Sequence, residues 1–477
     1  MTKTGKRRGF GSLGVVVGAV AIALGAACGG SEVAPPDAKC TPGQSLACVG
    51  GVSLAGSGGA EAGQATSGSS DTVAGAGGTV LPGPEHELLW GEVDVNPLQP
   101  SVVHDVPLSI DSTGATEVSA ALMAWLAALP AASALAPAMI RFAKGGTYWV
   151  DYTILLRNDG GTGGIEGAMW PDVPAFDRSY TRLELNGATL EQRTKVPYKK
   201  GTTVLDPRKR WGDPILVTGG AHDVELANGT LRGPNPSANY QPAFEEWTGL
   251  RLNADPLEAS TENLWIHHLS IESVFGDFIY LSSKTAAGSE LKDVLIEDCT
   301  MKGAGRQGLV LHGGTHLVIR RNELRNVERL LIDCEPTATQ GWHYVSISKN
   351  TGSAGDLGFF QLSGNTNTSA ADHLELVDNT IDHGLLTVDL GNTSPGTRAG
   401  FRFVGNRNVG PGVFKKTSIW PAVVRTVSWD ELDIRDNVQA VDPVTMPTAV
   451  RFDGVAPVSA LVTGNCWANA PDDQCMK

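Results

Sequence analysis

The segments LVIRRN at 317–322, VSISKN at 345–350 and LELVDN at 374–379 decide the fold of this chain. Each has apolar residues at its first and third positions and asparagine at its sixth. Related copies occur throughout the second half of the sequence: Leu264–Leu269, Val294–Cys299, Phe401–Asn406, Leu432–Asn437 and Ala460–Asn465. Successive copies begin 23 to 31 residues apart. A repeat of this length built on one short strand is typical of a solenoid whose coils stack on one another.

The alternation within each copy turns one face of the strand inward, because successive side chains of a strand point to opposite sides. Asparagine at the sixth position tolerates left-handed backbone at a turn, and its amide can bond the asparagine of the next coil. We therefore expect an asparagine ladder at one corner of the coils, formed by Asn322, Asn350, Asn379, Asn406 and Asn437.

A second apolar strand follows in most repeats: Phe278–Leu281, Gly308–Leu311, Leu330–Asp333, Phe359–Leu362 and Leu385–Val388. Two or three short strands per coil predict an all-β, right-handed, single-stranded parallel β-helix. A propeller blade needs about 40 residues or more, and the spaced leucines of a leucine-rich horseshoe are absent from the sequence. Glycine is abundant (58 of 477 residues) and charged residues make up only 18%, which suits a fold with many tight turns.

The N-terminal part of the folded region has a different pattern. Residues Thr116 to Leu129 carry apolar side chains at helical spacing, and Pro130 ends the run. This helix is expected to cap the open end of the β-helix, where unpaired strand edges would otherwise recruit another chain. We assign residues 85–205 to the cap and first coils and residues 206–477 to the β-helix repeats.

The first 84 residues indicate export. Residues 1–27 resemble a signal peptide, with a basic start at Lys3–Arg8 and an apolar run at Leu13–Ala27 that is too short to span a membrane comfortably. Leu24–Cys28 resembles a lipobox in which Cys28 is lipidated, and Arg7–Phe10 partly resembles a twin-arginine signal. The alternatives are an outer-membrane lipoprotein and a secreted protein, exported by either route.

Residues 28–84 are rich in Gly, Ala and Ser and are expected to form a disordered tether. In an oxidising compartment the nearby cysteines would form two disulfides, Cys40–Cys48 and Cys466–Cys475. Cys299 and Cys334 fall in repeat strands and are expected to be buried thiols. The net charge of −14 argues against nucleic acid as a partner, since phosphate binding needs clustered basic residues. A monomer is expected.

Polar residues flank the second strand in three successive repeats. Asp277 precedes one strand, Arg306 and Gln307 precede the next with His312 after it, and Asp333 and Glu335 end the third. Coils stack about 4.8 Å apart, so residues at equivalent positions should share one surface. We predict Asp277, Arg306, Asp333 and Glu335 as catalytic residues and Gln307, His312 and Tyr280 as substrate-binding residues.

A loop before one strand adds three more candidates for substrate binding. Glu245, Glu246 and Trp247 could overhang the groove, with the Trp247 ring as a platform for a sugar. No Walker loop, dinucleotide-binding fingerprint or clustered Cys/His metal site occurs in the sequence.

Several segments together resemble exported right-handed parallel β-helix proteins of the pectate-lyase-like superfamily. They lie in the same order between about residues 105 and 365: Ile140–Tyr148, Arg208–Trp211, Ala227–Pro236, Phe275–Tyr280, Gly305–Gly308 and Ile332–Pro336. The segment Cys40–Gly50 also resembles cysteine segments of exported myxobacterial proteins, of lipoprotein type. The superfamily includes lyases, hydrolases, epimerases and glycan-binding tail proteins, so the resemblance implies the fold and leaves the reaction open.

The predicted cluster suits two kinds of chemistry on a polysaccharide. Two carboxyl groups about 5 to 9 Å apart can share the acid and base work of glycoside hydrolysis. Carboxylates can instead hold Ca²⁺ against a uronate while Arg306 takes a proton, as in a lyase. The alternatives are a non-catalytic glycan-binding or adhesin-like surface protein, and an ion-pair ladder that only fixes the register of the coils.

Overall fold

A computed structural model describes most residues between 85 and 467. The longest undescribed stretches within this range are 157–177, 205–212, 363–370, 411–422 and 440–449. Contacts divide the chain into a unit of residues 1–76 and a unit of residues 77–477, and all described residues belong to the second. The predicted signal peptide, Cys28, the tether, Cys40, Cys48 and Cys475 lie outside the described residues, so lipidation and both disulfides stay predictions.

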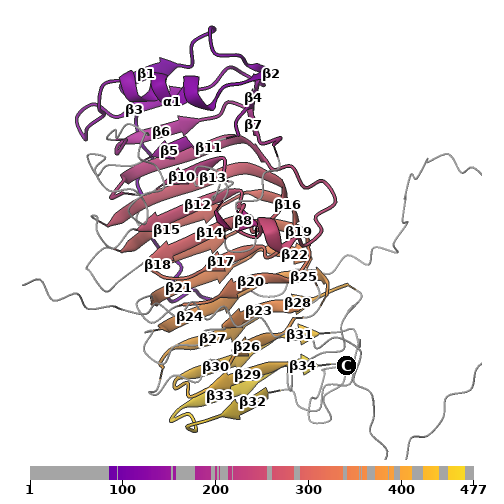
Figure 1. Cartoon of the computed structure of the whole chain (residues 1–477). Coiled ribbons are helices and arrows are strands. Elements are labelled where there is room, and N and C mark those ends of the chain that lie inside the picture. Colours follow the sequence, from indigo (N-terminus) through magenta and orange to yellow (C-terminus); the bar gives the residue numbers. More distant parts are fainter. Residues whose placement is uncertain are drawn as a thin grey trace, which may run out of the picture. The chain divides into compact units, whose positions relative to one another are not determined.

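The described strands confirm the parallel β-helix. They stack in parallel columns, coil upon coil (Figure 1), and form a 22-stranded and a 10-stranded sheet. The register follows the sequence repeat, because the first residues of successive copies, Leu264, Val294, Leu317, Val345 and Leu374, are direct partners. All five are buried in one continuous hydrophobic core.

The 22-stranded sheet consists of two columns, which the long strands β11 and β13 join. The first column contains β1 (Val102–Asp105), β3 (Ala138–Arg141), β6 (Thr181–Glu184), β11 (His222–Arg232), β13 (Thr261–Val274), β15 (Leu291–Glu297), β18 (Gly314–Arg320), β21 (Trp342–Ser348), β24 (Ala371–Val377), β27 (Phe401–Val404), β30 (Leu432–Arg435) and β33 (Ala460–Thr463). The second contains β2 (Thr113–Glu117), β4 (Thr147–Trp149), β7 (Thr189–Glu191), β16 (Thr300–Ala304), β19 (Glu323–Val327), β22 (Thr351–Ser353), β25 (Thr380–His383), β28 (Arg407–Asn408), β31 (Val438–Gln439) and β34 (Cys466–Trp467).

The ten-stranded sheet holds the strands that sequence analysis placed second in each repeat. It contains β5 (Ile154–Leu156), β10 (Ile215–Val217), β12 (Leu250–Ala254), β14 (Ile279–Ser283), β17 (Leu309–Leu311), β20 (Leu330–Cys334), β23 (Gly358–Leu362), β26 (Val388–Leu390), β29 (Val424–Val427) and β32 (Val450–Asp453). A short antiparallel pair, β8 (Lys199–Lys200) and β9 (Thr203–Val204), and a 3₁₀ turn at Pro242–Phe244 interrupt the coils. Cys299 and Cys334 are buried free thiols, as predicted.

The asparagine ladder is present and extends to Asn465. In each step, one side-chain oxygen accepts hydrogen bonds from the backbone and the amide of the asparagine one coil earlier; for Asn379 and Asn406 these measure 3.0 and 2.9 Å. One detail of the prediction is wrong. The left-handed residue is the one before the asparagine, as at Asp378, while the asparagine itself is buried and uses its side chain to bind neighbouring coils.

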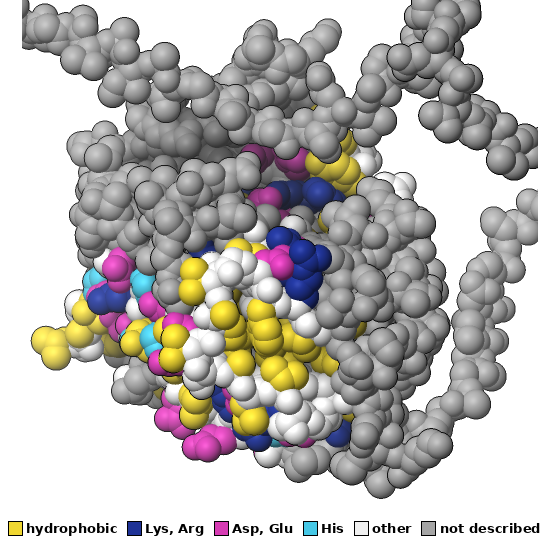
Figure 2. Space-filling model, turned by 90° about the horizontal axis from the view of Figure 1, so that it is seen from below, with side chains coloured by type: hydrophobic (Ala, Val, Ile, Leu, Met, Phe, Trp, Pro, Cys, Tyr) yellow, Lys and Arg dark blue, Asp and Glu magenta, His cyan; other side chains and the backbone are white. Residues whose placement is uncertain are grey.

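The two ends of the solenoid differ. Helix α1 (Ser119–Ala128) covers the N-terminal end and buries Leu122 and Leu126 in the core. It begins later than predicted, because residues from Thr113 to Glu117 form β2. The other end, seen in Figure 2, carries exposed hydrophobic side chains of the last coils, among them Phe452, Val458 and Leu461. Among the described residues, no helix is long and apolar enough to cross a membrane.

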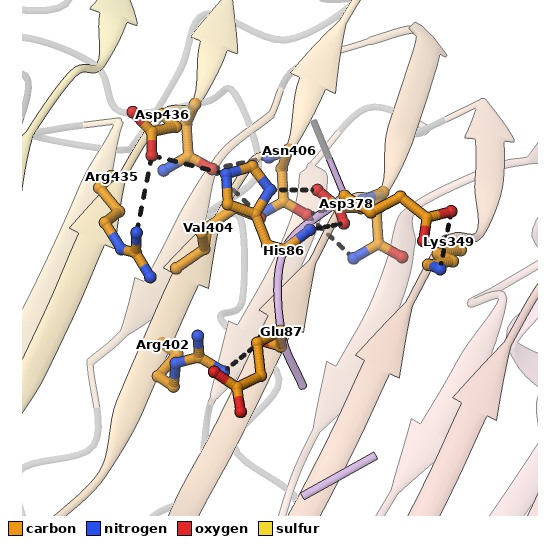
Figure 3. A network of polar contacts seen from close by, with 12 residues as sticks. His86, Glu87, Lys349, Asp378, Arg402, Val404, Asn406, Arg435 and Asp436 are labelled. Carbon is orange, nitrogen blue, oxygen red and sulfur yellow. Dashed lines mark hydrogen bonds and ion pairs between the residues drawn. The ribbon is translucent and has the colours of Figure 1, made fainter. Parts of the chain in front are cut away.

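An N-terminal segment, residues 85–98, lies against the 22-stranded sheet, and we call it the strap. His86 lies between Asp378 and Asp436, which follow β24 and β30 (Figure 3): its backbone and Nδ1 bind the Asp378 carboxylate at 3.0 and 2.7 Å, and its Nε2 lies 3.5 Å from Asp436. At the other end, the backbone N–H of Leu98 donates to Glu225 at 3.2 Å. The strap therefore connects coils more than 200 residues apart in sequence.

Candidate functional site

The ten-stranded sheet places the predicted site residues on neighbouring coils. Tyr280 in β14, Val310 in β17 and Asp333 in β20 are register partners, so they form one line across three strands. His312 and Glu335 follow Leu311 and Cys334, which are also partners, and therefore lie side by side one step further along. The repeat thus converts sequence positions about 23 to 30 residues apart into direct neighbours.

Arg306 joins two carboxylates from different coils. One terminal nitrogen lies 3.2 Å from Asp277 Oδ2, and the other donates to Glu335 Oε2 at 2.9 Å. Burial alone would lower the pKa of Arg306, but the charges of Asp277 and Glu335 outweigh it and raise the pKa above its ordinary value. The predicted convergence of Asp277, Arg306 and Glu335 is therefore present, with the guanidinium at its centre.

Asp277 is fully buried, and both of its oxygens are occupied. Its Oδ1 accepts from the backbone N–H of Gln307 at 3.0 Å, and its Oδ2 faces Arg306. Burial raises the pKa of Asp277 to about 6, although the Arg306 charge and the Gln307 hydrogen bond oppose the shift. Asp277 is therefore placed to hold Arg306, because it is buried away from any ligand and one of its oxygens faces the guanidinium.

Asp333 is buried beside Glu335 in the same coil. Its Oδ2 accepts from the Gln307 amide at 2.9 Å, whereas its Oδ1 has no hydrogen-bond partner among the described residues. Burial and the nearby Glu335 charge raise the pKa of Asp333 well above its ordinary value. Gln307 is also buried, and its Oε1 accepts from the backbone of Leu330 at 2.7 Å. Gln307 therefore supports Asp333 within the protein, and its role in substrate binding stays a prediction.

Glu335 is the exposed carboxylate of the cluster, with 37% of its side chain accessible. Partial burial of Glu335 would raise its pKa. The interaction with His312 and the charge of Arg306 stabilise the ionised form more strongly and lower the pKa to about 2. His312 Nε2 lies 3.6 Å from Glu335 Oε2, and His312 Nδ1 is hydrogen-bonded to the Tyr280 hydroxyl at 2.8 Å. Glu335 is thus ionised and accessible, beside an Asp333 whose pKa is raised.

The sequence did not reveal the residues that support this site from the preceding coils. Arg251 in β12 is the register partner of Tyr280, and its guanidinium lies 4.2 Å from the centre of the Tyr280 ring. Asp213 accepts from Arg251 Nε at 2.8 Å and from the Thr248 backbone and hydroxyl at 3.0 and 2.6 Å. In the sequence, only the alignment of Arg251 with Tyr280 one coil later could have indicated that Arg251 supports the site. No local sequence pattern indicated the role of Asp213.

The loop before β12 does not supply the predicted sugar platform. Trp247 is only 4% exposed, because its ring packs edge to face against Phe244 and Phe275. Glu245 accepts from the Tyr240 hydroxyl at 2.8 Å, and Glu246 lies 3.9 Å from Arg251. Glu245 and Glu246 are half-buried at the edge of the site, and Trp247 belongs to the packing beneath it.

The arrangement can perform acid–base chemistry. Two carboxyl groups two residues apart have pKa values that are shifted in opposite directions, and such a split separates a proton donor from a proton acceptor. Arg306 fixes the acceptor from one side and His312 faces it from the other. Among the described residues, no group of three or more His, Cys, Asp and Glu side chains is placed to hold a metal ion.

No known family matches this sequence, and no curated protein resembles it closely enough to be identified. Several solved structures are similar in fold. Endo-xylogalacturonan hydrolase from Aspergillus tubingensis has a TM-score of 0.44 at 12% identity, covering 76% of this chain and 100% of that one. The family 28 exopolygalacturonase of Yersinia enterocolitica has a TM-score of 0.37 at 10% identity over 78% and 79% of the two chains. A tailspike of E. coli bacteriophage HK620, in complex with a pentasaccharide, has a TM-score of 0.39 at 10% identity over 76% and 64%. At such identities they transfer no activity to this chain.

Proposed function

We propose that this protein is a carbohydrate-active enzyme that hydrolyses a glycosidic bond of an extracellular polysaccharide at the cluster around Glu335. The observation that carries the proposal is the opposite shift of two adjacent carboxyl pKa values, raised at Asp333 and lowered to about 2 at Glu335. In this assignment Asp333 is the general acid and Glu335 is the general base that activates water.

Arg306 and Asp277 complete the site in supporting roles. Arg306 holds the Glu335 carboxylate in its ionised form and at a fixed position, and Asp277 holds Arg306. The glycan would lie over the ten-stranded sheet, where Glu335 is accessible. A guanidinium between two carboxylates keeps its proton, so Arg306 is a poor base. This favours hydrolase chemistry over a lyase mechanism in which Arg306 removes a proton.

A non-catalytic glycan-binding or adhesin-like surface protein is the second candidate. It is favoured by the way in which Arg306 spans three coils, since an ion pair of this kind also fixes the register of a solenoid. The two candidates differ in one respect. An enzyme needs the carboxyl groups of Glu335 and Asp333 for turnover, whereas a scaffold needs Arg306 for stability.

The test is the replacement of Arg306 by Lys, assayed on a panel of neutral and uronate glycans. Lysine keeps the charge but loses the planar fork that binds Asp277 and Glu335 at once. We expect turnover to fall about 100-fold or more, with little change in melting temperature. Reducing ends report hydrolysis, and the ultraviolet absorbance of unsaturated products reports lyase activity.

Arg402→Lys is the matched control, because Arg402 joins Glu375 and Asp433 on the 22-stranded sheet, away from the site. It should lower the melting temperature and leave turnover intact. Two results together would assign the cluster to a structural role: a large loss of thermal stability in Arg306→Lys, and a native protein that turns over no glycan of the panel.

We also propose that the chain is exported and that Cys28 carries the lipid anchor, which would give the domain reach from the outer membrane. The basic start, the apolar run and the Cys28 context support this. Mass spectrometry of the N-terminal peptide from the native host would show either diacylglycerol on Cys28 or a cleaved, unmodified chain.

A further inference from the structure

Tyr280 and His312 form a pair whose hydrogen bond fixes the position of one proton. The Tyr280 hydroxyl and His312 Nδ1 are 2.8 Å apart, and the two rings are 4.8 Å apart. A neutral imidazole has one nitrogen that donates and one that accepts, so the direction of this bond decides which nitrogen of His312 carries the proton.

The surroundings set the direction of the bond. Burial raises the pKa of Tyr280 above its ordinary value, so its hydroxyl keeps a proton to donate. On the other side of the ring, His312 Nε2 lies 3.6 Å from the Glu335 carboxylate, and a ring nitrogen that faces a carboxylate is stabilised when it carries the proton. His312 Nδ1 is then the acceptor, and the proton of a neutral His312 lies on Nε2.

His312 Nε2 faces the candidate base. It lies 3.6 Å from Glu335 Oε2, beyond ordinary hydrogen-bond distance, and has no hydrogen-bond partner in the described part of the chain. Nε2 is itself buried from solvent, so its proton would stabilise the Glu335 carboxylate directly by charge.

We propose that Tyr280 is a positioning residue that holds His312 as the Nε2–H tautomer, so that the Nε2–H bond faces the Glu335 carboxylate and keeps it ionised as the base that activates the attacking water. This inference rests on the proposed hydrolase function. Glu335 takes a proton from the water, and the water oxygen bonds to the anomeric carbon. The glycosidic C–O bond breaks, and the leaving oxygen takes the proton of Asp333.

The preceding coil explains why Tyr280 is rigid enough for this role. Arg251 lies over the ring face, and Asp213 fixes Arg251 through a buried ion pair in which the two side chains are 5% and 0% exposed. Asp213, Arg251, Tyr280, His312 and Glu335 thus form a continuous line of contacts across successive strands. Only its last member, Glu335, is well exposed.

The experiment compares Tyr280→Phe with the native full chain, labelled with ¹⁵N in its imidazole rings. Phenylalanine keeps the ring under Arg251 and removes only the hydroxyl. Long-range proton–nitrogen spectra near neutral pH distinguish the two tautomers, and a His312→Gln variant assigns the signals. Tyr344→Phe is the matched control, because Tyr344 stacks on His373 and His316 outside the site.

We expect the native His312 to give the Nε2–H pattern and Tyr280→Phe to give a mixture of tautomers. Tyr344→Phe should leave the His312 signals unchanged. On a glycan that the native protein hydrolyses, Tyr280→Phe should lower kcat about tenfold and shift the pH profile, with KM nearly constant.

Two results would overturn the inference: an Nδ1–H pattern in the native protein, or a His312 spectrum that Tyr280→Phe leaves unchanged. An altered spectrum with an unaltered kcat and pH profile would overturn the positioning role. If the spectra behave as expected but the native protein hydrolyses no glycan of the panel, the proposed function fails while the tautomer assignment stands.

Discussion

Two clusters of carboxylates and arginine on the two sheets use the same residue types in different ways. On the 22-stranded sheet, Glu375 is fully buried and accepts hydrogen bonds from the strap at Leu89 and Trp90 and from Arg402, at 3.0, 3.1 and 2.7 Å. Arg402 in turn donates to the Glu87 backbone at 3.0 Å (Figure 3). The hydrogen bonds of Glu375 and Arg402 are therefore made to other groups of the protein.

In the cluster on the ten-stranded sheet, several polar atoms make no hydrogen bond and one carboxylate is exposed. Glu335 is 37% exposed, and Asp333 Oδ1, His312 Nε2 and Arg306 Nε have no hydrogen-bond partners among the described residues. At Glu375, by contrast, both carboxylate oxygens accept hydrogen bonds from within the protein. The difference that matters for a ligand is exposure, because the Glu335 side chain is 37% exposed and the Glu375 side chain is 0% exposed.

The same substitution made in both clusters should separate a catalytic from a structural role. Glu335→Gln removes the candidate base and should lower kcat by about 1000-fold, with little change in melting temperature. Glu375→Gln leaves Arg402 buried beside a neutral side chain, so we expect it to cost about 3 kcal/mol of unfolding free energy and to leave kcat intact. Calorimetry and reducing-end assays on both variants provide the measurements.

If Glu375→Gln abolished turnover as well, the strap would be coupled to the site and the two regions could not be treated as independent. If Glu335→Gln lost stability and kept turnover, the cluster on the ten-stranded sheet would be a second fastening.

The pH dependence of stability should come from the ten-stranded sheet. Burial raises the pKa of Asp277 and of Asp389 to about 6 each. Since the folded protein binds these protons more tightly than the unfolded chain does, their contribution is complete below about pH 4 and is lost as the pH rises through about 6. We expect the unfolding free energy to fall by up to about 3 kcal/mol per group over that window. Asp277→Asn should flatten the curve, as measured by urea denaturation at several pH values.

Asp389→Asn is the matched control, because Asp389 pairs with Arg425 in another part of the same sheet. It should flatten the stability curve in the same window without changing the pH profile of turnover. An unfolding free energy that rose between pH 4 and 6 would contradict the raised pKa of both groups.

The smallest expected effect concerns the ladder beside the strap. Asn379→Ala removes bonds to Asn350, Asn406 and the Ile347 backbone, and we expect a loss of about 1–3 kcal/mol in unfolding free energy with unchanged turnover. Chemical denaturation measures the loss. A change within about 0.5 kcal/mol would show that the ladder adds little to the solenoid.

The sequence predicted the coils and much of the site for one reason. Apolar residues at alternate positions fix which face of each strand turns inward, and a repeat of nearly constant length fixes which residues of successive coils are partners. Asp277, Arg306 and Glu335 could therefore be brought together from their positions alone. The same reasoning placed Asn322 and its successors in one ladder.

Only the tertiary structure decided how each side chain is used. Trp247 could have faced a ligand or the core, and the packing of Phe244 and Phe275 placed it in the core. His86 and Asp378 are 292 residues apart, and no local pattern links them. Asp333 and Glu335 are both acidic in the sequence, yet burial raises one pKa while Arg306 and His312 lower the other. The periodic pattern determined the backbone because pairing is local and repeated, whereas solvation and charge depend on all the neighbours that the fold assembles.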